Sequence, residues 1–265
     1  MLSYDALIEQ AGRRGMPAQK LRGIVREYLQ ILILHALSRH ESGKKLFFTG
    51  GTYLRLIHDL KRFSEDLDFN TAEIKKEEFE VLIHALQTEL KRLNIRCEVK
   101  FRHWGQIFAA SLVFSEIEER YGVISKFSRK AGIVIKVETN RPAWLIKKET
   151  AVISGYGEIF PCLCTDKGSL FADKIDALMK KKRGRHLYDI IFMLSNRFPV
   201  NNAVSSSLDL GDAPLKILLD GVMRFSRAEL KRQAESLKPF LFEESESDWI
   251  IEAHQIVPSL IEKYK

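Results

Sequence analysis

Two short motifs constrain this chain most: a glycine pair that closes one apolar run, and two aspartates in the next. The motifs read Phe47-Phe48-Thr49-Gly50-Gly51-Thr52 and Asp66-Leu67-Asp68-Phe69. Because glycine has no Cβ, the backbone at Gly50 and Gly51 can approach a ligand closely. Because side chains alternate along a strand, the carboxylates of Asp66 and Asp68 leave the same face. The first motif could cradle phosphates, and the second could hold a divalent cation.

Length and composition indicate a globular protein. The chain has 265 residues and is 45% hydrophobic, enough to bury one sizeable core or two modest ones. The apolar run 31–34 is ended by His35, and no apolar run approaches the roughly 20 residues that span a bilayer. The first residues, 1–5, lack the order of a secretory signal. We therefore expect a cytoplasmic protein with no membrane partner.

Cysteine content and net charge indicate which metal sites and which partners the protein could have. The chain has three cysteines, Cys97, Cys162 and Cys164, and no second thiol pair to complete a tetrahedral zinc site. Its net charge of +7 favours polyanionic partners, of which nucleic acid is the most common. Charge alone does not distinguish such a protein from a basic protein that binds no anion.

Apolar spacing predicts a mixed α/β (α+β) architecture. We expect a long helix from Pro17 to Ser42, helices at 52–60 and 75–93, and strands at 46–49, within 63–70, and at 95–101, 107–114 and 132–139. Beyond residue 167 the pattern is helical, with segments 168–182, 185–197, 212–225, 227–238 and 246–263. The polar segment 199–214 is the expected linker. We predict a core domain at 1–165 and a helical domain at 166–265.

A third carboxylate is needed if the two aspartates hold a pair of Mg²⁺ ions, which in such sites lie about 3.5–4 Å apart. Glu138 fits best, because Lys136 and Glu138 alternate with the apolar residues of their strand. Glu98 is the weaker candidate, since its strand is shorter and flanked by charges. An isolated Asp-x-Asp pair is more often a solvated strand face, so the assignment depends on the glycine motif as well.

The combination of motifs points to nucleotidyl transfer. Backbone N–H groups at a helix start bind terminal phosphates, and carboxylate-bound metals activate the α-phosphate. The order of the motifs resembles the nucleotidyltransferase fold of the DNA polymerase β superfamily. Within it, segments 48–55 and 62–69 look like the AbiEii family, the toxin half of abortive-infection type IV toxin–antitoxin systems.

A second block carries the same resemblance. Family members have a Lys-x-x-Ala-Leu helix followed by an Arg-Asp-x-x-Asp-like turn, and this chain has segments 174–178 and 185–190 in those places. His186 stands where the family usually has aspartate, and Lys181 where arginine is common. Lys174, Arg185 and Asp189 remain in register. The resemblance covers residues 40 to 195.

The resemblance implies a polymerase β-like core with a mixed sheet, a helical C-terminal lobe and a role for each motif residue. Asp66 and Asp68 would bind Mg²⁺, and Glu138 would complete the site and accept the proton of the attacking hydroxyl. Lys174 would neutralise the triphosphate, with Asp189 holding Lys174 or Arg185 in position. The remaining nucleotide-binding residues would be Gly50, Gly51, Thr52, Arg62, Ser64 and Arg185.

The resemblance also implies the substrates and partners. An NTP would donate its nucleoside monophosphate with two Mg²⁺ ions, or Mn²⁺ in their place, to an RNA acceptor such as the 3′ end of tRNA. Translation would then stop, and a separately encoded antitoxin would restrain the effect. The basic runs 180–185 and 126–130 could grip an RNA backbone, although each could equally be a solvated surface.

Two alternatives remain open at the level of sequence. A small-molecule nucleotidyltransferase of the antibiotic-modifying kind would share the carboxylate site, but it would need an acidic pocket for a cationic acceptor, which the positive net charge disfavours. A catalytically silent RNA-binding regulatory module would keep the fold without the reaction, which the intact carboxylate triad disfavours.

Overall fold

The chain divides into two compact units in the computed structural model, which describes residues 1–123 and 132–264. The first, here called the sheet unit, comprises Met1–Asp59, Phe63–Pro142 and Lys148–Cys164. The second, the helical unit, comprises Leu60–Arg62, Ala143–Lys147 and Thr165–Lys265. The predicted basic run 126–130 lies outside the described residues.

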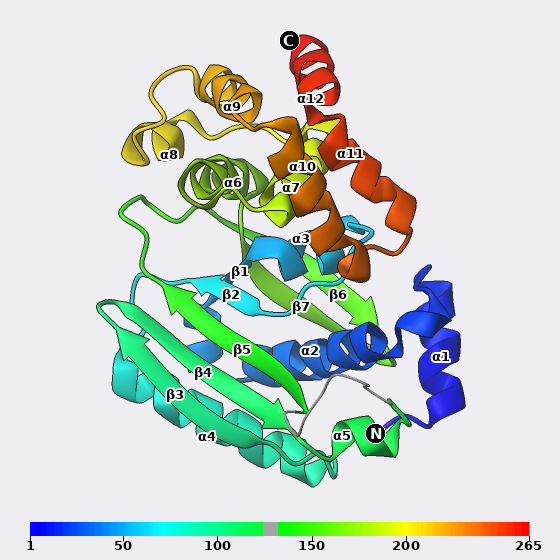
Figure 1. Cartoon of the computed structure of the whole chain (residues 1–265). Coiled ribbons are helices and arrows are strands. Elements are labelled where there is room, and N and C mark those ends of the chain that lie inside the picture. The colour runs from blue at the N-terminus through cyan, green and yellow to red at the C-terminus, as the bar shows by residue number, and fades with distance from the viewer. Residues whose placement is uncertain (124–131, 265) are drawn as a thin grey trace. The chain divides into compact units, whose positions relative to one another are not determined.

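The sheet unit is built on a seven-stranded sheet in the order β3-β4-β5-β2-β1-β7-β6 (Figure 1). β2 pairs in parallel with β5 and β1 with β7, whereas β1–β2, β3–β4 and β4–β5 are antiparallel. The predicted mixed α/β fold is therefore confirmed. The strands are β1 (Phe47–Thr49), β2 (Leu67–Asn70), β3 (Glu98–Trp104), β4 (Ile107–Phe114), β5 (Ile133–Asn140), β6 (Lys148–Gly155) and β7 (Glu158–Thr165).

Strands β6 and β7 were not predicted from the sequence. A two-residue turn, Tyr156-Gly157, separates them, and both turn residues have positive φ, 53° and 84°. Two adjacent residues with positive φ match the right-handed twist of a hairpin. Tyrosine rarely adopts such a φ, so the turn carried no recognisable sequence signal.

Helices cover one face of the sheet and leave part of the other face open. Phe79 of α4 packs against Phe108 of β4 with ring centroids 6.2 Å apart. On β5, Ile135 and Val137 are fully buried, while the alternate residues Lys136 and Glu138 are only partly buried. The side of the sheet that carries Lys136 and Glu138 is called the open face below. The helices of this unit are α1 (Tyr4–Arg13), α2 (Leu21–Arg39), α3 (Gly50–His58), α4 (Lys76–Arg92) and α5 (Ile117–Arg120), with 3₁₀ turns at Ala18–Lys20 and Ser42–Lys45.

A buried ion pair joins α3 to α2. The Arg55 Nε atom donates to Glu27 Oε2 at 2.8 Å, and the two side chains are 1% and 2% exposed. A second guanidinium nitrogen of Arg55 donates to Asp59 at 2.9 Å. A buried charge is stable only when it is paired and hydrogen-bonded, so Arg55 fixes α3 against α2.

The helical unit follows β7 in the chain. It contains α6 (Lys167–Lys181), α7 (Gly184–Ser195), α8 (Asn202–Ser207), α9 (Pro214–Met223), α10 (Arg227–Leu237), α11 (Asp248–Ile251) and α12 (Ala253–Glu262), with 3₁₀ turns at Lys238–Phe240 and Glu244–Ser247. The predicted helical character of the C-terminal part is confirmed. None of the helices in the described part of the chain is both long enough and apolar enough to cross a membrane.

The predicted linker at 199–214 was wrong. Its asparagine and serine residues form the helix α8, whose N-cap Asn201 accepts hydrogen bonds from the N–H groups of Ala203 and Val204. Val204 is 2% exposed and packs against Ala172 in a small apolar cluster. Asparagine and serine favour both turns and helix caps. Here Asn201 caps a helix, because burial of Val204 stabilises the helical conformation.

Candidate active site

Parallel pairing of β2 with β5 places two carboxylates side by side. Asp68 on β2 and Glu138 on β5 are direct Cα partners. Directly paired residues project to the same face of a sheet. β2 begins at Leu67, so Asp66 lies at the entrance of the strand rather than within it as expected. Glu98 lies on β3, two strands beyond β5 in the sheet order, and does not join this group.

Lys136 lies among these carboxylates. Its Nζ atom donates to Glu138 Oε2 at 2.7 Å and is 4.0 Å from Asp66 Oδ2. Burial lowers the pKa of Lys136, but the hydrogen bond that it donates to Glu138 and the charges of Asp66, Glu138 and Asp68 outweigh burial, and the net pKa is raised. Lys136 had no predicted role, although its position two residues before Glu138 places both side chains on one face of the strand.

The donor set suits a hard divalent cation, although it is not a closed cage. Carboxylate oxygens are the ligands that Mg²⁺ prefers, and Mg²⁺ usually keeps several waters and takes only one or two protein carboxylates plus substrate phosphates. Among the described residues no three His, Cys, Asp or Glu side chains converge closely enough to hold a metal by themselves. A cation bound by Asp66, Asp68 or Glu138 would therefore need further ligands from water or substrate.

Gly50 brings the start of α3 against Asp68. Its φ is +82°, and a Cβ atom at this position would lie 2.5 Å from Asp68 Oδ2. Only glycine can accept both the φ and the contact. The buried Thr52 hydroxyl donates to the main-chain oxygen of Asp66 at 2.5 Å, which ties the first turn of α3 to the aspartate loop. With Gly51 also buried, phosphate binding here would rest on backbone N–H groups rather than on side chains.

Three predicted site residues form a buried ion cluster in the helical unit. Arg62 donates to both carboxylate oxygens of Asp189, at 2.7 and 2.8 Å, and Lys174 Nζ donates to Asp189 Oδ2 at 2.8 Å. Asp189 is fully buried. Burial raises the pKa of Asp189, but Arg62 and Lys174 outweigh burial and hold it well below its usual range. Asp189 thus pairs with Lys174, one of its two expected partners, and also with Arg62, which was not expected.

The remaining predicted nucleotide-binding residues have less defined surroundings. Arg185, at the start of α7, is half-buried. Ser64 is also half-buried, and its main-chain oxygen accepts a hydrogen bond from Gln30 at 3.0 Å.

His186 is an unusual neighbour of the cluster. It is 9% exposed, and neither ring nitrogen has a hydrogen-bond partner among the described residues. Burial, followed by the charge of Lys174, lowers its pKa to about 3. His186 is therefore a neutral imidazole at neutral pH.

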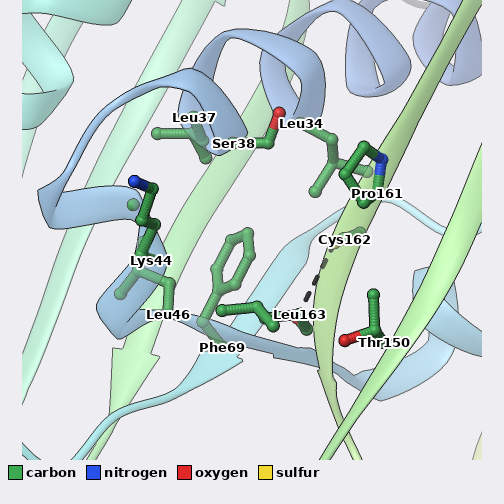
Figure 2. Close-up of a pocket in the computed structure, with 11 residues that line it drawn as sticks. Leu34, Leu37, Ser38, Lys44, Leu46, Phe69, Thr150, Pro161, Cys162 and Leu163 are labelled. Carbon is green, nitrogen blue, oxygen red and sulfur yellow. Dashed lines mark hydrogen bonds between the residues drawn. The ribbon is translucent and has the colours of Figure 1, made fainter.

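An apolar pocket lies on the side of the sheet opposite to the carboxylates of Asp68 and Glu138 (Figure 2). Its volume is about 250 Å³, and Leu34, Leu37, Phe69 and Pro161 are among its lining residues. Phe69 follows Asp68 on β2, so its side chain leaves the other face of the sheet from the carboxylate. The pocket is therefore separate from the carboxylate group.

Comparison with known families assigns the chain. The family model described as "Nucleotidyl transferase AbiEii toxin, Type IV TA system" matches residues 32–252. The chain belongs to the AbiEii family. The predicted family and the predicted nucleotidyltransferase class are thereby confirmed, and the AbiEii match extends past residue 195, where the recognised motifs ended.

Solved structures share the fold of this AbiEii protein. MenT4, a nucleotidyltransferase toxin from Mycobacterium tuberculosis H37Rv, matches with a TM-score of 0.60 and 17% identity over 97% of this chain and 90% of that one. JHP933 from Helicobacter pylori matches with a TM-score of 0.55 and 17% identity over 94% of each chain. At these identities the likeness shows the fold. A comparison with curated proteins finds no match.

Replacement of Gly50 by alanine should displace Asp68. Gly157 is the matched control, because it has a similar φ of +84° and open space where a Cβ would lie. We expect Gly157→Ala to lower the free energy of unfolding by about 1 kcal/mol through φ strain alone. Gly50→Ala should cost roughly 1–3 kcal/mol more through the clash and should also lower nucleotidyl transfer. Urea unfolding of both variants checks this, and equal losses would contradict the contact with Asp68.

His186 should make the protein less stable in mild acid. The unfolded chain takes up a proton on His186 below pH 6.5, whereas the folded chain does so only near pH 3, so acidification favours unfolding. Between pH 7 and 5 this costs about 2 kcal/mol. His186→Gln should remove that part of the pH dependence, and His84→Gln, at an exposed position of α4, should not. Urea unfolding at pH 7 and pH 5 tests this. An equal change in the free energy of unfolding between the two pH values for His186→Gln and the wild type would refute it.

Proposed function

We propose that this protein transfers a nucleoside monophosphate from an NTP to an RNA acceptor. The attacking hydroxyl oxygen forms a bond to the α-phosphorus, the bond from the α-phosphorus to the bridging oxygen breaks, and pyrophosphate leaves. Glu138 accepts the proton of the attacking hydroxyl. The observation that carries this proposal is the pairing of Asp68 with Glu138, with the start of α3 held against Asp68 by Gly50.

Asp66, Asp68 and Glu138 are the residues that would hold Mg²⁺, or Mn²⁺ in its place. When bound, the ions stabilise the negative charge on the transferred phosphoryl group and its leaving oxygen. The backbone N–H groups of Gly50, Gly51 and Thr52 bind the β- and γ-phosphates, where the positive end of the α3 dipole favours anions.

The helical-unit residues have supporting roles in this proposal. Lys174 neutralises phosphate charge as a point cation. Asp189 positions Lys174, and Arg62 fixes Asp189, because its Nε and one terminal nitrogen both donate to that carboxylate. Arg185 of the helical unit and Ser64 of the sheet unit are the further residues proposed to bind phosphate.

The acceptor and the partner follow from charge and family. A net charge of +7 and the basic run 180–185 suit an RNA phosphate backbone. Membership of a type IV toxin family implies a cognate antitoxin. We propose the 3′ end of tRNA as the acceptor, so that the modified tRNA cannot be aminoacylated and translation stops. The reaction would take place in the cytoplasm.

Labelled NTPs test the reaction. Incubated with Mg²⁺ and total tRNA, the wild-type protein should transfer label from at least one of the four NTPs. Asp68→Asn should reduce transfer by roughly 100-fold or more, because it removes a carboxylate that would hold Mg²⁺ at the transferred phosphate. Glu149→Gln, which alters an exposed carboxylate on β6 of the same sheet, should leave transfer unchanged. Absence of transfer with every NTP, or full activity of Asp68→Asn, would overturn the proposal.

Lys136 should compete with a divalent cation for the carboxylates. Removal of its charge, about 4 Å from Asp66, should raise Mn²⁺ affinity by about tenfold or more in Lys136→Met. Lys148→Met, at an exposed position of β6, should bind Mn²⁺ like the wild type. Titration followed by electron paramagnetic resonance measures both. A lower affinity in Lys136→Met would show instead that Lys136 assembles the cation site.

A further inference from the structure

The edge strand β3 presents a basic and aromatic row to solvent. Lys100, Arg102 and Trp104 are exposed, whereas the alternate residues Phe101 and His103 are only half-buried and face α4. Phe101 lies against His84 of α4 with ring centroids 5.3 Å apart, and His103 lies against Phe79 at 6.3 Å. The exposed row is thus on the side of the sheet that α4 does not cover.

The strand register carries this row across to the carboxylates. Arg102 is the Cα partner of Ala109 on β4, Ala109 of Glu138 on β5, and Glu138 of Asp68 on β2. Paired residues share a face, so all four side chains project to the same side of the sheet, where Arg102 is exposed, Asp68 and Glu138 are partly buried and Ala109 is buried. With neighbouring strands about 4.8 Å apart, the Cα atom of Arg102 lies about 10 Å from that of Glu138 and about 14 Å from that of Asp68. No break in the sheet separates these three residues.

The chemistry of the row suits a single-stranded polyanion with planar bases. The Arg102 guanidinium lies 5.9 Å from the centroid of the Trp104 ring, a cation–π contact, and Trp104 remains 45% exposed. Lys100 and Arg102 are about 6.8 Å apart along the strand, so each can meet a different phosphate. Glu98, at the other end of the row, is its one exposed acid. Exposed aromatic rings beside cations bind single strands through base stacking and phosphate contacts.

We propose that the β3 platform, defined as Lys100, Arg102 and Trp104, binds the single-stranded end of the RNA acceptor. A base stacks on Trp104, and the phosphates on either side meet Lys100 and Arg102. The strand then runs across β4 toward Asp68 and Glu138. The direction in which the RNA runs rests on the proposed function. The β-strands that it would cross, β3, β4 and β5, lie side by side in that order (Figure 1).

Binding of a short fluorescent single-stranded RNA, followed by anisotropy at several salt concentrations, tests the platform without any reaction. Trp104→Ala should weaken binding about tenfold, and Trp104→Phe, which keeps a ring, should retain most of it. The double variant Lys100→Ala/Arg102→Ala should weaken binding by about tenfold or more and reduce the salt slope by about 1.4. The control Lys91→Ala/Arg92→Ala removes two exposed charges from α4 and should change affinity less than about twofold.

Several results would overturn the platform. They are wild-type affinity in both platform variants, an equal loss in the α4 control, no binding of single-stranded RNA by the wild type, or equal binding of duplex RNA with no effect of Trp104→Ala. The labelled-NTP assay separates this inference from the proposed function. Label transfer that is unaffected by the platform variants refutes the platform alone, whereas absence of transfer with intact RNA binding refutes the proposed reaction alone.

Discussion

The parallel pairing of β2 with β5 is the constraint on which the site depends. It places the carboxylates of Asp68 and Glu138 on neighbouring strands in direct register. Two like charges at that separation repel each other and favour a cation between or beside them. Lys136 meets part of this requirement through its 2.7 Å hydrogen bond to Glu138. In the proposed reaction, divalent cations meet the rest.

The rest of the sheet unit holds a helix start next to that pair. Gly50 lets the backbone pass close to Asp68, the Thr52 hydroxyl fixes the loop that carries Asp66, and the buried Arg55–Glu27 pair anchors α3 from its other side. Each of these contacts joins residues distant in sequence. Together they orient backbone N–H groups without requiring a charged side chain at the start of the helix.

The sequence predicted those parts of the fold that depend on local periodicity. The alternation in β5 and the Asp-x-Asp spacing anticipated that Glu138 would lie beside Asp68, and helical spacing anticipated the C-terminal helices. The β6–β7 hairpin was missed because Tyr156 takes an uncommon φ in its turn. The Arg62–Asp189 pair was missed because its partners are 127 residues apart, and no local pattern reports such a contact.

Lys136 shows a different limit of sequence reasoning. A lysine two residues from a glutamate on a strand is common and predicts no function. The structure shows that the Lys136 Nζ atom also lies 4.0 Å from Asp66 Oδ2, which places it in the carboxylate group. The open face likewise became visible only through the register that joins Arg102 to Glu138 across β4. Both observations depend on pairing between strands, which sets the chemistry of the site.

The most direct test of the account is the position of Mn²⁺ in crystals grown with a non-hydrolysable NTP analogue, located by anomalous scattering. The account predicts a Mn²⁺ peak bonded at about 2.0–2.2 Å to Asp68 and to at least one of Asp66 and Glu138, with Lys136 moved away from Glu138. A Mn²⁺ peak elsewhere on the protein, with the Lys136–Glu138 hydrogen bond intact and the triphosphate away from Gly50, would contradict it.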